Sequence, residues 1–179
     1  MRVIAGSARG RKLAAPRGDK TRPTPDRVRE ALFSILAPNL PDARVLDLFA
    51  GTGALGIEAL SRGALSATFV EKDRSTVTLL RENLGLLPGA STEVVTLPVE
   101  RALAGLEGQF DLIFMDPPYD AGLLDPTLGQ ISQFQLLRRG GIAVCEHRGS
   151  ASPPQPPAGF SLISTRTWGD VGATLIMCN

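Results

Sequence analysis

Strand-like and helix-like segments alternate along most of this chain. Between residues 44 and 146, short apolar runs rich in β-branched residues are separated by segments that have helical spacing or helix-capping residues. The expected strands span residues 45–49, 67–71, 93–97, 110–116 and 142–146, and the expected helices span residues 53–60, 74–84, 100–106 and 126–139. Asp73 and Asp125 are expected to cap the second and fourth of these helices. The alternation predicts an α/β fold with a doubly wound, mostly parallel sheet.

The end of the chain predicts a different arrangement. Residues 160–168 and 171–178 have the composition of two strands, and Gly169-Asp170 between them suits a tight turn. We therefore expect an antiparallel hairpin that completes a seven-stranded sheet.

Residues 1–42 are expected to form an extension that docks on a body made of residues 43–179. Within the extension, residues 2–6 and 11–15 alternate loosely and are expected to pair as a small basic hairpin. A polar linker over residues 17–23 then leads to a helix.

The start of this helix carries the usual signals. Thr24 is expected to be the N-cap and Pro25 the first helical residue, and Pro38 ends the helix. Apolar side chains follow at helical spacing, at Val28, Ala31, Leu32, Ile35 and Leu36. Because such a stripe needs a surface to pack on, the extension should be docked rather than loose.

Charge is distributed unevenly along the 179 residues. The first 30 residues hold nine basic and three acidic side chains, whereas the other 149 hold ten basic and fifteen acidic side chains. A basic arm on a mildly acidic body predicts a polyanionic partner that is reached through the arm. A solvated charged tail is the alternative that this composition leaves open.

The composition also excludes several classes of protein. There is no run of 18 apolar residues and no apolar segment typical of a signal peptide, so we expect a cytoplasmic protein that does not enter the membrane. Cys145 and Cys178 lie in apolar strands and lack metal-ligand spacing. We expect both to be reduced core thiols, and we expect no metal site.

A glycine-rich loop follows the first expected strand. Asp47-Leu48-Phe49-Ala50-Gly51-Thr52-Gly53 leads into the first helix of the α/β unit, where open sheets of this type bind ligands. Residues 51–56 also satisfy G-x-G-x-x-G, so an NAD-dependent oxidoreductase is a rival interpretation. Glu71, at the end of the second strand, can accept both hydroxyls of a ribose, and it could do so for NAD or for S-adenosylmethionine.

Asp47 distinguishes between the two cofactors. A carboxylate four residues before Gly51 would repel a pyrophosphate, but it would attract the ammonium and sulfonium charges of S-adenosylmethionine. The sequence therefore favours S-adenosylmethionine over a dinucleotide.

Asp116-Pro117-Pro118-Tyr119 follows the fourth expected strand. Two consecutive prolines cannot extend a ladder, so the chain must turn stiffly there. The turn presents a carboxylate, a proline carbonyl and an aromatic ring, which suit a flat base with an exocyclic amine: the ring stacks on Tyr119, and the amine donates to Asp116 and the Pro117 carbonyl. The alternative is a plain turn after an aspartate.

Taken together, these motifs resemble a known family. The loop, Glu71 and residues 116–119 are similar to class I S-adenosylmethionine-dependent methyltransferases, which have a Rossmann-like sheet. Residues 22–36 (RPTPDRVREALFSIL) and 46–63 (LDLFAGTGALGIEALSRG) resemble the bacterial 16S ribosomal RNA guanine-N2 methyltransferases, the guanine-966 enzymes. The resemblance covers nearly the whole chain.

The resemblance implies an activity and a set of site residues. The expected activity is methyl transfer to the N2 amine of a guanine in 16S ribosomal RNA, by a monomer acting on a 30S subunit or an assembly intermediate, with S-adenosylhomocysteine as product and no metal. The catalytic residues would be Asp116, Pro117, Pro118 and Tyr119. Cofactor contacts would come from Asp47, Phe49, Ala50, Gly51, Thr52, Gly53, Glu71, Lys72, Pro98, Val99 and Asp116, and RNA contacts from Arg9, Arg11, Lys12, Arg22, Thr24, Arg27 and Arg29.

The chain departs from the family pattern in three places. Thr52 stands where serine is frequent. Residues 97–100 lack the aspartate that many class I enzymes direct at the adenine amine, which implies that backbone at Pro98 and Val99 holds the adenine. Trp168 stands where a tyrosine is expected. Two further activities remain open: an adenine-N6 or cytosine-N4 methyltransferase, which shares the logic of Asp116 to Tyr119, and an RNA-binding module without catalysis.

Overall fold

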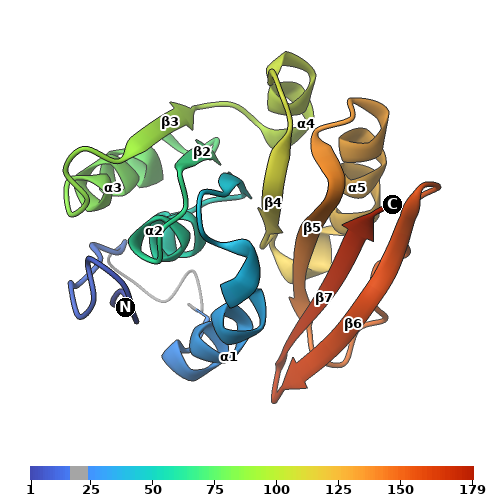
Figure 1. The fold of residues 1–179 in the computed structure, drawn as a ribbon, viewed down its shortest axis with the longest axis horizontal. Coiled ribbons are helices and arrows are strands. Elements are labelled where there is room, and N and C mark those ends of the chain that lie inside the picture. The colour runs from blue at the N-terminus through green and yellow to red at the C-terminus, as the bar shows by residue number, and fades with distance from the viewer. Residues whose placement is uncertain (17–23) are drawn as a thin grey trace.

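The computed structural model describes residues 1–16 and 24–179, and in these residues seven strands form one sheet (Figure 1). The strand order is β3-β2-β1-β4-β5-β7-β6. The strands are β1 (Arg44–Leu48), β2 (Ser66–Val70), β3 (Ser91–Val95), β4 (Phe110–Met115), β5 (Leu137–Arg148), β6 (Phe160–Trp168) and β7 (Val171–Cys178).

The first five strands are parallel, and β7 runs antiparallel to both β5 and β6. The predicted doubly wound sheet and its C-terminal hairpin are therefore confirmed. The order of the strands reverses at β1, which pairs with β2 on one side and β4 on the other. Loops that leave β1 and β4 at their carboxyl ends diverge at such a point, so a crevice opens between them.

Five α-helices cover the described sheet: α1 (Asp26–Leu36), α2 (Ala54–Ser61), α3 (Arg74–Leu84), α4 (Val99–Ala102) and α5 (Leu124–Gln133). Short 3-10 helices span Ala37–Asn39, Leu103–Gly105 and Tyr119–Ala121. The predicted cap of α3 is confirmed, because the Asp73 carboxylate accepts the Thr76 N–H at 2.7 Å. None of these helices is long and apolar enough to cross a bilayer.

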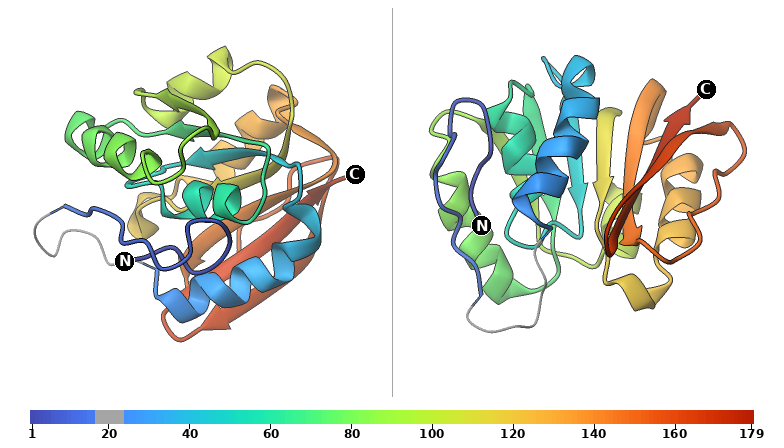
Figure 2. Two further views of the ribbon diagram at one scale, coloured as in Figure 1. Left: turned by 60° about the vertical axis from the view of Figure 1, so that its left-hand side comes forward. Right: turned by 90° about the horizontal axis from the view of Figure 1, so that it is seen from below.

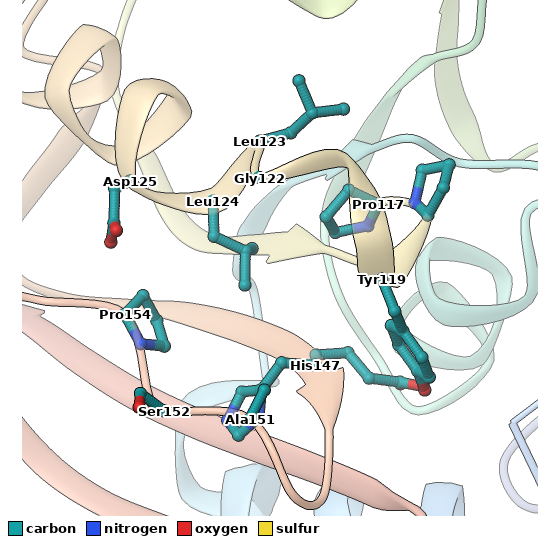
Figure 3. A pocket seen from close by; sticks show the side chains of 12 residues that line it. Pro117, Tyr119, Gly122, Leu123, Leu124, Asp125, His147, Ala151, Ser152 and Pro154 are labelled. Carbon is teal, nitrogen blue, oxygen red and sulfur yellow. The ribbon is translucent and has the colours of Figure 1, made fainter.

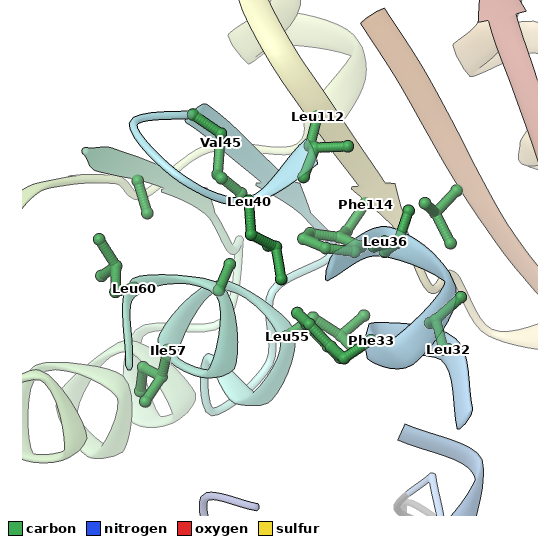
Figure 4. Packing of buried hydrophobic residues seen from close by; sticks show 14 of the residues in the cluster. Leu32, Phe33, Leu36, Leu40, Val45, Leu55, Ile57, Leu60, Leu112 and Phe114 are labelled. Atoms are coloured by element: carbon green, nitrogen blue, oxygen red, sulfur yellow. The ribbon is translucent and has the colours of Figure 1, made fainter. Parts of the chain in front are cut away.

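Two apolar clusters lie on opposite faces of the sheet, because neighbouring strand residues point to opposite sides. One cluster joins Val45, Leu112 and Phe114 of the sheet to α1, α2 and α3 (Figure 4). The other joins Leu46 and Ile113 to α4 and α5. Helices on both faces define the three-layer arrangement visible in Figure 2.

The N-terminal arm, residues 1–16, packs on the face of the sheet that is covered by α1, α2 and α3. Arg2 and Lys12 form one antiparallel bridge, so the expected hairpin pairing is present but is too short to be assigned as strands. Val3, Ala8 and Leu13 are buried in the cluster that contains α1 and α2. The arm is therefore part of the hydrophobic core.

Helix α1 differs from the prediction in its start and its stripe. Pro25, not Thr24, is the N-cap, and the Thr24 hydroxyl donates to Glu146 Oε1 instead. Ile35, expected in the stripe, is 40% exposed, whereas Phe33 is fully buried against Phe114, with ring centroids 5.5 Å apart. The buried face is rotated toward Phe33 because β4 presents an aromatic ring at that position.

The helix predicted for residues 126–139 ends early. Helix α5 stops at Gln133, Gln135 has a positive φ of 53°, and β5 already begins at Leu137 beside Phe110 of β4. Asp125 lies in the first turn and makes no cap, since Leu123 occupies that position. Sheet pairing with β4 thus overrides the local helical pattern.

Candidate active site

The loop after β1 contains three residues with positive φ angles, a conformation that glycine adopts more easily than other residues. Phe49, Gly51 and Gly53 all have positive φ angles, of 60°, 54° and 84°. A Cβ on Gly53 would lie 2.4 Å from Cδ1 of Leu80, so a larger residue would have to displace this side chain of α3 as well as adopt a positive φ. The loop folds back over the end of β1, and the Ala50 N–H donates to Val70 of β2 at 3.0 Å.

Asp47 lies beneath this loop and is only 2% exposed. Its carboxylate accepts the Gly56 N–H at 2.8 Å, which ties the end of β1 to α2. Burial raises the pKa of Asp47 to about 7, and the nearby charge of Glu71 adds to the rise. A cationic ligand above the loop would relieve this cost.

Replacing Asp47 with Asn should stabilise the ligand-free protein in a pH-dependent way. The folded-state pKa is raised above the unfolded value of 3.8, so the wild type loses stability as the pH rises through the window from 3.8 to about 7. Asn keeps an oxygen for Gly56 and carries no charge. Its gain in unfolding free energy should grow across that window to roughly 2–4 kcal/mol and then stay constant. Urea unfolding at intervals across the window measures this, and a gain independent of pH would contradict it.

Glu71 follows β2 and faces the same loop. Its Oε2 accepts the Gly51 N–H at 3.0 Å, and its Oε1 accepts the Asp73 N–H at 2.8 Å. Each carboxylate oxygen can accept a further bond, so the pair can still receive two hydroxyls of a ribose. The chain thereby fixes the carboxylate next to the glycine loop before any ligand arrives.

Substituting Glu71 with Ala should weaken cofactor binding more than it slows the chemical step. A charge-assisted hydrogen bond contributes about 1.5–3 kcal/mol, which corresponds to a 10- to 100-fold loss of affinity. Calorimetric titration with S-adenosylmethionine measures the effect, and the exposed Glu82 on α3, replaced by Ala, is the matched control. An unchanged affinity in the Glu71→Ala variant would place the ribose elsewhere.

The other expected cofactor residues lie beyond the ends of β2 and β3. Lys72 is exposed, and Pro98 caps α4, whose first residue, Val99, is buried. The Glu71 N–H donates to Val95 of β3 at 3.2 Å, so the chain leaves β3 beside Glu71. The Pro98 carbonyl already accepts the Arg101 and Ala102 N–H groups.

Asp116 stands at the end of β4, one residue after Met115. Burial raises its pKa well above the usual value, and the charges of Glu146 and Asp47 raise it further. The carboxyl groups of Asp47 on β1 and of Glu146 on β5 therefore lie close enough to Asp116 for their charges to act on it. This concentration of acid, together with the glycine loop, fits a cofactor that carries positive charge.

Tyr119 begins the short helix after Pro118, with its ring 39% exposed. Its hydroxyl donates to Glu146 Oε1 at 3.1 Å, and the Arg148 guanidinium lies 5.9 Å from the ring centroid. Since one end of the side chain is anchored, the ring is held in place while part of it stays accessible.

A cavity of about 160 Å³ opens beside this turn (Figure 3). Its walls are formed by the Pro117–Tyr119 turn, by the start of α5 near Leu123, and by the loop after β5 around Pro154. Glu146 and His147 also line it. Of the three carboxyl residues, Glu146 lines the cavity, and Pro117 in its wall directly follows Asp116 in the chain.

The expected RNA-binding residues do not form one set. Arg9, Arg11, Lys12 and Arg27 are exposed, and Arg22 lies outside the described residues. Arg29 is completely buried and donates to Asp26 at 2.8 Å and to the Arg2 carbonyl at 2.6 Å. Its assignment as an RNA contact is therefore wrong for this structure, because its position on the α1 face next to the arm buries it.

The roles of three polar residues in and near the site are not predicted by the sequence. Glu146 was treated only as part of a strand. Glu58 of α2 is buried and accepts the Ile4 and Ala5 N–H groups of the arm. Asn83 of α3 bonds the Thr52 carbonyl and both backbone groups of Ala14, and so links the arm to the cofactor loop. These side chains bond distant segments because the fold buries them against those segments. No local sequence motif predicts this burial.

No group of three or more His, Cys, Asp or Glu side chains within residues 1–16 and 24–179 is arranged to hold a metal ion.

Comparisons with solved structures agree with this architecture. The structure of yhhF from Escherichia coli has a TM-score of 0.91 at 38% identity, covering 100% of this chain and 98% of that chain. The SAH-bound methyltransferase PaMTH1 from Podospora anserina has a TM-score of 0.71 at 17% identity, covering 88% of this chain and 80% of that chain. The sheet, the crevice and the loop thus define a Rossmann-like methyltransferase fold.

Sequence comparisons give the family. The family model described as "Conserved hypothetical protein 95" matches residues 1–177, and the chain belongs to this family. Ribosomal RNA small subunit methyltransferase D of Escherichia coli K12 is 40% identical over 175 residues, 98% of this chain and 88% of that protein. The protein of the same name from Haemophilus influenzae is 35% identical over 179 residues, 98% of this chain and 92% of that protein. The resemblance found in the sequence is confirmed at the level of the family.

Proposed function

We propose that the protein transfers a methyl group from S-adenosylmethionine to the N2 amine of a guanine in 16S ribosomal RNA, within a 30S subunit or an assembly intermediate. The observation that carries the proposal is that Asp116 lies near Asp47 of the cofactor loop, while Pro117, the next residue, lines the cavity. The names of the relatives in Escherichia coli and Haemophilus influenzae support ribosomal RNA of the small subunit as the substrate.

The proposed chemistry follows from the acceptors at the turn. When bound, S-adenosylmethionine supplies an electrophilic methyl group on a sulfonium. The guanine N2 lone pair is delocalised into the ring, which makes N2 a poor nucleophile. Asp116 and the Pro117 carbonyl accept the two amine hydrogens, draw N2 toward tetrahedral geometry and stabilise the charge that develops on it.

Tyr119 acts on the base rather than on the amine. A base inside folded RNA must leave its stack to reach the cavity, which costs a few kcal/mol. Restacking on the exposed part of the Tyr119 ring offsets about 1–3 kcal/mol of that cost.

One experiment tests the substrate and the target atom together. Tritiated S-adenosylmethionine is incubated with the protein and with naked 16S RNA or 30S particles from cells that lack the enzyme, and the labelled nucleosides are then separated. We expect N2-methylguanosine from one position. Label in N6-methyladenosine or N4-methylcytidine would contradict the guanine-N2 assignment and indicate an adenine-N6 or cytosine-N4 methyltransferase. The absence of label in the RNA would contradict methyl transfer to this RNA.

The exposed basic residues of the arm should set the salt dependence of RNA binding. Replacing Arg9, Arg11 and Lys12 together with Gln should reduce the slope of log affinity against log salt by about 2, since each phosphate contact adds about 0.7 to 0.9. Filter binding at several salt concentrations measures the slope. Exposed Arg81, Arg101 and Arg166, replaced in the same way, serve as the control. An unchanged slope would contradict RNA binding by the arm and would indicate an RNA-binding surface on the body, near Arg138 and Arg139.

A further inference from the structure

Glu146 is a second acid beside the proposed amine site. Strands β4 and β5 are parallel, and Met115 pairs with Cys145. Asp116 directly follows Met115 and Glu146 directly follows Cys145, so the strand register places these two carboxyl residues side by side, and Pro117, the residue after Asp116, lines the cavity. Glu146 is 3% exposed and lines the cavity with Pro117 and Tyr119.

The hydrogen bonds of Glu146 orient its carboxylate. Of the described residues, Thr24 and Tyr119 are the two that donate to it, at 2.7 and 3.1 Å, and both bond the same oxygen, Oε1. With Oε1 fixed from two directions, the carboxylate cannot rotate freely. Thr24 therefore serves as a positioning residue, supplied by the segment that leads into α1.

A buried acid next to another acid is costly in the ligand-free site. Burial raises the pKa of Glu146, and the Thr24 and Tyr119 hydroxyls and the charge of Arg29 oppose the rise. Such an arrangement adds little stability by itself. A ligand that brought an N–H donor to this carboxylate would offset the cost.

We propose that Glu146 accepts the N1–H of the target guanine and thereby selects guanine over other bases that carry an amine. The inference rests on the proposed guanine-N2 activity. On the Watson–Crick edge of guanine, the N1–H donor lies directly beside the N2 amine. When Asp116 and the Pro117 carbonyl accept the amine hydrogens, the next donor along the edge faces the neighbouring strand, β5, which carries Glu146 beside Asp116.

The same geometry rejects the other candidate bases. Adenine carries a ring nitrogen with a lone pair beside its N6 amine, and cytosine carries one beside its N4 amine. Either lone pair would point at a carboxylate and leave it without a donor. A site built to hydrogen-bond one edge rejects an analogue that cannot complete the bond, because a buried polar group is then left unpaired.

The test compares guanine with 2-aminopurine, which keeps the 2-amine but has a lone pair at N1 and lacks the 6-oxygen. Small-subunit particles are reconstituted with either base at the methylated position, and kcat/KM is measured for the wild type and for Glu146→Gln. We expect the wild type to prefer guanine by about 10- to 100-fold. Glu146→Gln should lose most of this preference, because its amide N–H can donate to N1 of 2-aminopurine.

Each outcome decides a distinct point. Equal rates on the two bases with the wild-type enzyme would overturn the role of Glu146, and this comparison needs no variant that could fail to fold. A preference that survives in Glu146→Gln would assign the discrimination to the 6-oxygen instead and would also overturn the role. Exposed Glu82, replaced by Gln, is the control and should keep the full preference. If the wild type methylates neither base, the proposed function itself fails.

Discussion

Asp116→Asn is expected to lower the rate of methyl transfer by about 10²- to 10³-fold, with S-adenosylmethionine binding still measurable. Asn has the same shape, but it loses the negative charge and presents an NH₂ group toward an amine that needs an acceptor. Because burial raises the pKa of Asp116, the neutral variant should fold at least as stably as the wild type. Single-turnover assays at saturating cofactor separate the chemical step from binding.

The control for this prediction is Asp42→Asn. Asp42 is exposed and has a positive φ of 59°, which Asn also tolerates. This variant should retain the full rate. A near-normal single-turnover rate in Asp116→Asn, or in the more severe Asp116→Ala, would show that Asp116 takes no part in the reaction. The turn would then have a structural role.

Glu58→Ala is expected to reduce the free energy of unfolding by about 3–5 kcal/mol. Glu58 is fully buried and accepts the N–H groups of Ile4 and Ala5 at 2.7 and 3.0 Å, and it also pairs with Arg62 at 2.7 Å. Removing it leaves two amide groups and one guanidinium without this acceptor. The arm should then detach from α2.

Urea unfolding and limited proteolysis measure these two consequences. The variant should unfold at lower urea concentration, and cleavage within residues 1–16 should become faster. Glu58→Gln keeps one acceptor oxygen and should lose less stability. If the arm stays protected in Glu58→Ala, the apolar contacts of Val3, Ala8 and Leu13, with the hydrogen bonds of Ser61 and Asn83 to the arm, suffice to dock it.

The arm and the cofactor loop are joined by Asn83. Its side-chain amide donates to Thr52 in the loop and to Ala14 in the arm, at 2.9 and 3.0 Å. Thr24, farther along the same N-terminal segment, bonds Glu146. The segment that carries the exposed basic residues is thus anchored to both halves of the candidate site, which suits the proposed placement of an RNA base beside the cofactor.

Most of the helices and strands and the two motifs of the site could be predicted from local sequence. Apolar spacing predicted the parallel strands, the hairpin around Gly169-Asp170 and the capping of α3 by Asp73, because these features depend on a few neighbouring residues. The glycine loop and the Asp116–Tyr119 turn were recognisable for the same reason. Each consists of consecutive residues whose backbone limits and polar groups can be read directly.

The tertiary structure alone decided which polar groups meet. Thr24 and Glu146 are 122 residues apart and Ile4 and Glu58 are 54 apart, and no local pattern links such pairs. The pairing of Leu137 with Phe110 shortened α5, since ladder bonds to β4 outweighed the helical pattern of the segment. Arg29 looked like part of a basic surface, but packing of α1 and the arm buried it. Local chemistry predicts an element, whereas burial and charge pairing depend on every segment that packs around it.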